Sequence, residues 1–164
     1  MESDSVDRIV EAWRARDPNV DSSTLEVIGR LLQCATYFER AAGTVLDRFE
    51  LSIADFDVLN TLRRVGTRAG SKPTDLARSS LITTGAMTSR LDRLERAGLI
   101  TRGPDPDDRR GVLVRLTSHG NRLARKALDA LNAENEAFLD PLTQGQRHSL
   151  ASELKQLLLH HENK

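Results

Sequence analysis

The sequence of 164 residues has no apolar run long enough to cross a bilayer, and it contains a single cysteine. Cys34 cannot form a disulfide within the chain, which fits a reducing compartment. The first residues, Met1 to Asp7, are acidic and lack the basic and then apolar order of a secretion signal. We therefore expect a cytoplasmic protein without a membrane partner.

The motifs with which many enzymes hold phosphates and metals are also missing. The sequence has no glycine-rich phosphate loop, no His-Glu-x-x-His pair and no Cys-x-x-Cys pair. The four histidines lack ligand spacing, and the adjacent His160 and His161 point apart if they lie on one helix. We therefore do not expect an enzyme, and we expect no catalytic residue, no metal site and no cofactor.

The chain has no net charge, but its charges are unevenly distributed. Residues 63–126 contain 15 of the 24 Lys and Arg residues and only 6 of the 24 Asp and Glu residues. A basic centre between acidic ends is expected if the centre faces phosphate groups. Chance clustering on a solvated surface is the alternative, and charge alone does not decide between the two.

Hydrophobic periodicity predicts a mainly helical chain with one short hairpin. A short amphipathic helix carries Val6, Ile9, Val10 and Trp13 on one face, and a long helix follows from a capping box at Ser23 to about Phe49. Between residues 98 and 118 the period changes to that of strands, which predicts a hairpin with a charged turn at 103–111. Further helices are expected at 52–65, 73–78, 84–97, 118–139 and 143–160.

The order short helix, tight connection, second helix and hairpin predicts a winged helix-turn-helix, which places one helix in the major groove of duplex DNA. On the helix at 84–97, Met87, Leu91 and Leu94 form the buried stripe, so the small polar residues point the opposite way. Arginines at the hairpin tip suit a narrow minor groove, and an arginine on the helix flank can reach the phosphates. The predicted DNA contacts are Thr84, Gly85, Thr88, Ser89, Arg93, Arg109 and Arg110.

The hairpin carries the most specific motif. Asp108-Arg109-Arg110, followed after five residues by Leu116-Thr117, is similar to the wing of the MarR family of bacterial regulators. The segment from Thr84 to Ile100 resembles that family's recognition helix and first wing strand, and the resemblance spans nearly the whole chain. It implies a homodimer on an inverted-repeat operator and repression relieved by a small ligand. It also implies a single domain over residues 1–164, with a DNA-binding lobe at 52–117 and dimerisation helices at 1–50 and 118–164.

The two predicted C-terminal helices give a separate reason to expect a dimer, because they carry apolar stripes that a compact winged helix cannot cover. A second copy would bury them, and packing within one chain is the alternative. The stripe residues are Leu123, Ala127, Leu128, Leu131 and Phe138 in the first helix, and Leu150, Leu154, Leu157 and Leu158 in the second.

A narrower resemblance concerns the urate-responsive branch of the family, and it implies that Trp13, Asp57, Arg90 and Arg102 bind a small anion. An indole can cover a planar ligand, two arginines can receive its charge, and a carboxylate can accept its N–H groups. Urate, aromatic acids and small polycarboxylates all fit this chemistry. The alternatives are a core tryptophan and structural ion pairs, with Asp57 either solvated or paired with an arginine.

Two further functions remain open. Cys34 could sense oxidants, as in the peroxide-responsive branch of the family, although its place on the apolar side of the long helix predicts a buried, inert thiol. The second possible function is that of a helical interaction protein that does not bind DNA. That function would give the arginines of the hairpin no role.

Overall fold

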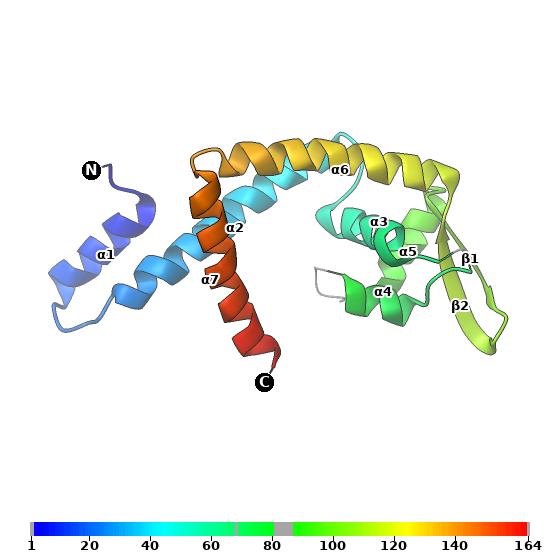
Figure 1. Cartoon of the computed structure of the whole chain (residues 1–164), viewed down its shortest axis with the longest axis horizontal. Coiled ribbons are helices and arrows are strands. Elements are labelled where there is room, and N and C mark those ends of the chain that lie inside the picture. Colours follow the sequence, from blue (N-terminus) through cyan, green and yellow to red (C-terminus); the bar gives the residue numbers. More distant parts are fainter. Residues whose placement is uncertain (1, 68, 81–86, 164) are drawn as a thin grey trace. The chain divides into compact units, whose positions relative to one another are not determined.

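The computed structural model describes residues 2–67, 69–80 and 87–163, apart from the side chain of Arg109. These residues form helices and one antiparallel hairpin, which confirms the predicted fold class (Figure 1). The elements are α1 (Ser5–Arg16), α2 (Ser23–Asp47), α3 (Ile53–Val65), α4 (Pro73–Ser79), α5 (Met87–Arg96), β1 (Ile100–Asp105), β2 (Asp108–Leu116), α6 (Ser118–Leu139) and α7 (Gln144–Glu162). Among these helices none combines the length and apolar character that a membrane span requires.

The chain divides into two compact units, residues 1–44 and residues 45–164, and α2 runs across the boundary. In the first unit Val6 of α1 packs so closely on Gly29 of α2 that a Cβ at Gly29 would lie 2.9 Å from a Val6 methyl. Arg30 of α2 pairs with Asp4 and Asp7 at the start of α1. These contacts hold α1 against α2.

The apolar face predicted for α1 is only partly buried. Val6 and Val10 are each 2% exposed, whereas Ile9 and Trp13 are 45% and 48% exposed. The interpretation of Trp13 as a core residue is therefore wrong for this chain. The predicted capping box at Ser23 is also wrong, because Ser23 is the first helical residue and its N–H is bound by the Asp21 carboxylate at 2.9 Å.

The core of the second unit joins α3, α4, α5 and the hairpin to the N-terminal half of α6. Leu91 and Leu94 are buried as predicted, and Met87 packs partly against them. Ala124 and Ala127 lie in the same core, and Leu123, Leu128 and Leu131 pack against it. The expectation that a winged helix cannot cover the stripe of α6 is therefore wrong for Leu123, Ala127, Leu128 and Leu131, because this part of α6 packs on the core around α3.

The hairpin is longer than predicted and has a tighter turn. Pairing runs from Ile100 with Leu116 to Pro104 with Val112, and the register then shifts so that Asp105 pairs with Asp108. Pro106 and Asp107 form the turn, and the shift places residues 109–111 in an irregular part of β2. Pro104 is tolerated because β1 is an edge strand. On the other side of β2, Ser71 exchanges two backbone hydrogen bonds with Val114, at 3.0 and 2.9 Å. Ser71, two residues before the start of α4, therefore holds the hairpin at Val114.

Candidate nucleic-acid interface

The exposed face of α5 is polar, and its opposite face is the buried leucine stripe. Thr88 and Ser89 are exposed at the start of the helix, and Asp92 and Arg96 continue the same side. Thr84 and Gly85, which are expected to lie in the preceding turn, fall outside the described residues. The exposed face of α5 thus carries short hydroxyl side chains, which allow another molecule to approach the helix closely.

Arg93 fastens α5 to the N-terminus of α3. Its guanidinium forms an ion pair with Asp55, a carboxylate that is 4% exposed, and donates to the Ser52 hydroxyl at 3.2 Å. Ser52 caps α3, because its Oγ accepts the Asp55 N–H at 3.1 Å. A buried carboxylate without a cation would be strongly destabilising, so Arg93 positions α5 in addition to any contact with phosphate.

Arg102 ties the first strand of the hairpin to α5. Its guanidinium lies 2.6 Å from the Asp92 carboxylate and 3.6 Å from that of Glu95, and its backbone N–H donates to Glu95 at 3.0 Å. A further bond of 3.4 Å reaches the Thr88 carbonyl. Arg102 and these two carboxylates therefore help to hold β1 against α5.

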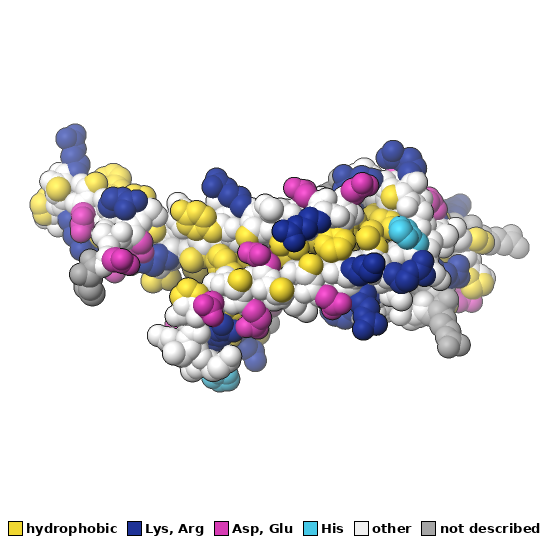
Figure 2. Space-filling view, turned by 90° about the horizontal axis from the view of Figure 1, so that it is seen from above, with side chains coloured by type: hydrophobic (Ala, Val, Ile, Leu, Met, Phe, Trp, Pro, Cys, Tyr) yellow, Lys and Arg dark blue, Asp and Glu magenta, His cyan; other side chains and the backbone are white. Residues whose placement is uncertain are grey.

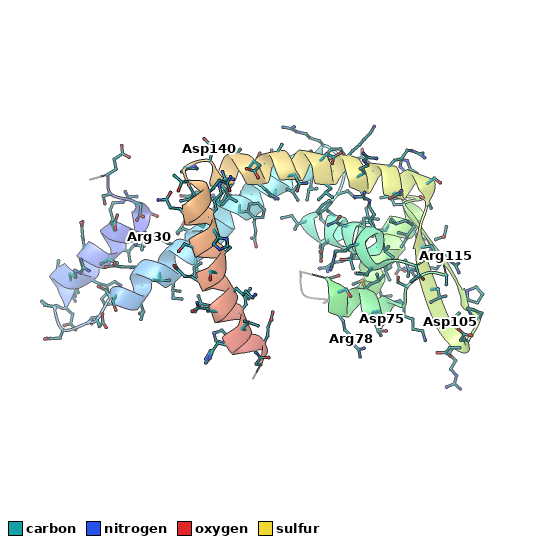
Figure 3. All side chains as sticks on the ribbon, viewed as in Figure 1. Arg30, Asp75, Arg78, Asp105, Arg115 and Asp140 are labelled. Carbon is teal, nitrogen blue, oxygen red and sulfur yellow. The ribbon has the colours of Figure 1, made fainter. Side chains whose placement is uncertain are left out.

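The hairpin tip presents Arg110, which is exposed and whose backbone N–H is bound by Asp108 at 3.0 Å. Arg109 lies in β2, and its side chain is outside the described part of the chain. Figure 3 shows Asp105 toward this end of the hairpin and Arg115 toward the other. The tip therefore carries an exposed arginine.

Asp105 is a buried carboxylate just behind the tip, and each of its oxygens has its own partner. Oδ1 accepts the Asp107 N–H at 3.0 Å, and Oδ2 lies 3.1 Å from the Lys72 Nζ. The Asp107 N–H and then Lys72 hold the pKa of Asp105 below its ordinary value of 3.8. Asp105 in turn raises the pKa of Lys72.

The four expected ligand residues fall in different units. Trp13 lies in the first unit, in a groove of about 390 Å³ on α1 that Ile9 and Ala12 line together with Arg8 and Arg16. The other three belong to the second unit, where Asp57 is 8% exposed and Arg90 is half-buried. The alternative of a solvated Asp57 is therefore wrong.

Cys34 is exposed on α2, so the expectation of a buried thiol is also wrong. Further apolar side chains of α2 and α7 are exposed, among them Leu32 at 64% and Leu158 at 59%. Figure 2 shows such hydrophobic side chains at the surface among Lys and Arg side chains. Each of these helices thus presents apolar side chains that its own unit leaves exposed.

Sequence reasoning missed Asp55, Lys72 and Asp105, all of which position the interface. Asp55 occupies the third position of α3, where a capping box explains a carboxylate without any arginine. Lys72 was detectable, because a lysine directly before Pro73 stands where a capping side chain is preferred.

The comparisons with known proteins agree with this geometry. The model of the MarR family matches residues 51–112, which include α3, α4, α5 and most of the hairpin. The regulator PecS of Dickeya dadantii is 35% identical over 156 residues, covering 94% of this chain and 93% of PecS. The multiple antibiotic resistance protein MarR of Escherichia coli is 35% identical over 94 residues, covering 57% of this chain and 63% of that protein.

Among solved structures, the C80S mutant of Escherichia coli MarR in complex with operator DNA has a TM-score of 0.71 at 27% identity. The match covers 89% of this chain and 97% of that one. A MarR-like regulator of Bacillus cereus has a TM-score of 0.76 at 18% identity and covers 85% of this chain and 99% of that one, which supports the fold alone. The chain therefore belongs to the MarR family and is a DNA-binding transcriptional regulator.

Proposed function

We propose that the protein is a homodimeric repressor that places α5 in the major groove of an inverted-repeat operator and the hairpin tip in the adjacent minor groove. The observation that carries the proposal is the polar, exposed face of α5 with Thr88 and Ser89, on a helix fixed by Arg93 to α3 and by Arg102 to β1. A helix held at both flanks can read base edges without a large ordering cost. Thr84 and Gly85, which lie outside the described residues, are further DNA contacts in this proposal.

Arg109 and Arg110 supply the wing contact in this proposal. A narrow minor groove has enhanced negative potential, which attracts arginine. Phosphate and minor-groove contacts release counterions, so binding should weaken steeply with salt. An interaction protein without affinity for DNA would show no such dependence.

The test begins with selection of bound duplexes from random DNA, followed by fluorescence anisotropy with the selected duplex. Arg110→Ala should weaken binding by about tenfold and lower the salt slope by about one, as expected for one lost arginine contact. Lys155→Ala removes the same charge from the exposed side of α7 and serves as the matched control. Equal affinity of Arg110→Ala and Lys155→Ala would contradict the wing contact, and failure to select any palindromic duplex would contradict the operator.

We also propose that a small anion, urate or an aromatic or carboxylate compound, releases the protein from DNA. Support comes from Trp13, whose exposed indole lies beside Arg8 and Arg16 in the groove on α1. Arg90 is on α5 itself, and Arg102 is held by carboxylates that an anion would replace. Taking Arg102 from Asp92 would loosen β1 from α5 and shift the protein toward states that fit the operator poorly.

Release by an effector is tested by adding millimolar urate or salicylate to the protein–duplex complex. We expect either anion to lower DNA affinity, and we expect Arg90→Ala and Trp13→Ala to lose the response. Arg16→Lys, which keeps the charge beside Trp13, is the control. Titration calorimetry that detects no heat with purines or aromatic acids at millimolar concentration would contradict release by such an anion.

A further inference from the structure

Lys72 stands at a position that its own helix does not explain. It is the N-cap residue of α4 and makes no side-chain hydrogen bond to the helix. Ser, Thr, Asp and Asn are preferred there, because their oxygens accept the free N–H groups of the first turn. A positive charge at the N-terminus also opposes the helix dipole. Capping of α4 therefore does not explain a lysine at this position.

The contact that Lys72 makes is with the hairpin. Its Nζ lies 3.1 Å from Oδ2 of Asp105, whose side chain is 4% exposed. Asp105 ends β1 and pairs with Asp108 across the turn, at the end of the hairpin opposite Ile100. A carboxylate this deeply buried needs a cation, and Lys72 is the one that the described part of the structure places against it.

The hairpin meets the segment before α4 at two separate places. Ser71 holds the base through its two backbone bonds to Val114, and the adjacent Lys72 reaches the tip. Between them lies a groove of about 390 Å³ that is lined by Asp75 and Ser79 of α4 and by Asp107 and Leu113 of the hairpin. The ion pair between Lys72 and Asp105 links the segment before α4 to the hairpin tip at this groove.

We propose that Lys72 and Asp105 form a latch that holds the hairpin tip against the N-terminus of α4 and so sets the direction in which the tip meets DNA. Both are positioning residues, because neither needs to touch DNA itself. The inference rests on the proposed function, since it presupposes that Arg110 at the tip contacts the duplex.

Because the two oxygens of Asp105 have different partners, a substitution can remove one interaction and keep the other. Asp105→Asn keeps an acceptor at Oδ1 for the Asp107 N–H and removes the charge that pairs with Lys72. Simple electrostatics predicts tighter DNA binding when a carboxylate is removed from a DNA-facing element. The latch predicts the opposite sign for Asp105→Asn. Asp107→Asn, in the same turn with an exposed carboxylate, is the matched control because it changes the charge equally.

The experiment measures affinity for the selected duplex as a function of salt, in the wild-type and in the Arg110→Ala backgrounds. We expect Asp105→Asn and Lys72→Met to weaken binding by about tenfold and to lower the salt slope by about one, the size of one lost arginine contact. Lys72→Arg should restore most of the affinity, and Asp107→Asn should bind at least as tightly as wild type. In the Arg110→Ala background, Asp105→Asn should have little further effect. Amide hydrogen exchange at residues 106–110 should be faster in Asp105→Asn.

Different outcomes overturn the two proposals. If Arg110→Ala weakens binding but Asp105→Asn binds as tightly as Asp107→Asn, the latch is wrong and the wing contact stands. If Arg110→Ala itself binds like wild type, the wing contact is wrong and the positioning role falls with it. Thermal unfolding of each variant shows whether lost affinity reflects lost folding, and equal melting temperatures with unchanged hairpin exchange would also contradict the latch.

Discussion

At the residue scale, Gly98 is the point where the chain leaves α5 and enters the hairpin. Its N–H donates to the Glu95 carbonyl and the next N–H, of Leu99, donates to the Leu94 carbonyl, which is the Schellman pattern. The pattern requires a left-handed backbone, and Gly98 has φ +68°. A glycine is therefore needed here for its backbone and not for space, because no heavy atom lies within 4 Å of where its Cβ would be.

We predict that Gly98→Ala lowers the free energy of unfolding by about 1 kcal/mol. Alanine is strained in the left-handed conformation, and this strain is partly offset because alanine has less conformational entropy than glycine in the unfolded chain. Urea unfolding measures the change. Gly145→Ala is the matched control, because that glycine also has open space around its Cβ but lies within α7 without a positive φ. The control should be neutral or stabilising. Equal destabilisation by both substitutions would contradict the strain argument.

The carboxyl group of Asp105 leads to a second prediction, which concerns how the stability of the protein depends on pH. Its lowered pKa means that its contribution to stability is fully present above the ordinary value of 3.8 and is lost as the pH falls through the lower folded value. The raised pKa of Lys72 has the opposite sign, so its contribution is lost only as the pH rises above 10.5. The stability difference between wild type and Asp105→Asn should therefore be constant near neutral pH and shrink in acid.

Unfolding by urea at pH values from 2 to 8 measures this difference, and carbon NMR of the Asp105 carboxyl reports its titration directly. Asp107→Asn should show no comparable loss of stability at neutral pH, because its carboxylate is exposed. A titration of Asp105 at or above its ordinary pKa would contradict the arrangement of hydrogen bonds around it.

At the element scale, the first turn of α6 packs closely against the backbone just before β1. Thr117 caps α6 through the Gly120 N–H at 2.9 Å, and its own N–H donates to the Leu99 carbonyl at 3.0 Å. Its hydroxyl donates to the Gly98 carbonyl at 2.8 Å and lies 3.2 Å from the Leu99 carbonyl. A Cβ on Gly120 would lie 1.9 Å from that same carbonyl oxygen. The close approach lets α6 continue directly from the hairpin while packing on α3.

We predict that Gly120→Ala destabilises the protein by about 1–3 kcal/mol, the range for an overpacked core, because the added methyl must push α6 away from backbone that cannot move aside. The measurement is urea unfolding, with Gly145→Ala near the start of α7 as the control. Reduced DNA affinity should accompany the loss, since displacing α6 also disturbs the hairpin base. A Gly120→Ala protein as stable as wild type would show that the two elements do not meet this closely.

The helices could be predicted from sequence, since their bounds follow from periodicity and from caps such as Ser52 and Thr143. The hairpin turn could not be placed, because Gly103 and Pro104 are typical of loops and only the pairing with Leu113 and Val112 draws them into a strand. The buried stripe of α5 followed from the spacing of its leucines. The partners of Arg93 and Arg102 could not be predicted, because an ion pair across elements has no periodic signature.

At the scale of the whole molecule, the surplus of basic residues at 63–126 pointed to the DNA-binding lobe without showing how many of them are available. Arg93 and Arg102 pair with carboxylates, and so does Lys72. These three build the lobe, so the number of charges free for phosphate is smaller than the count by sequence suggests. The exposure of Trp13 and Cys34 could not be predicted either, because a helical pattern does not show whether the rest of the chain covers an apolar face.

The uncovered apolar surface of α7 leads to the last prediction. Leu157 and Leu158 are 48% and 59% exposed, and we expect a second copy of the chain to bury them. The double variant Leu157→Ser, Leu158→Ser should therefore sediment as a monomer at micromolar concentration and lose most of its operator affinity, because a two-fold dimer sets two reading helices about 34 Å apart, one turn of DNA. Val65→Ser, which removes a 41% exposed valine from the end of α3, should stay dimeric. A wild-type protein that sediments as a stable monomer, or a double variant that dimerises like wild type, would contradict a dimer built on α7.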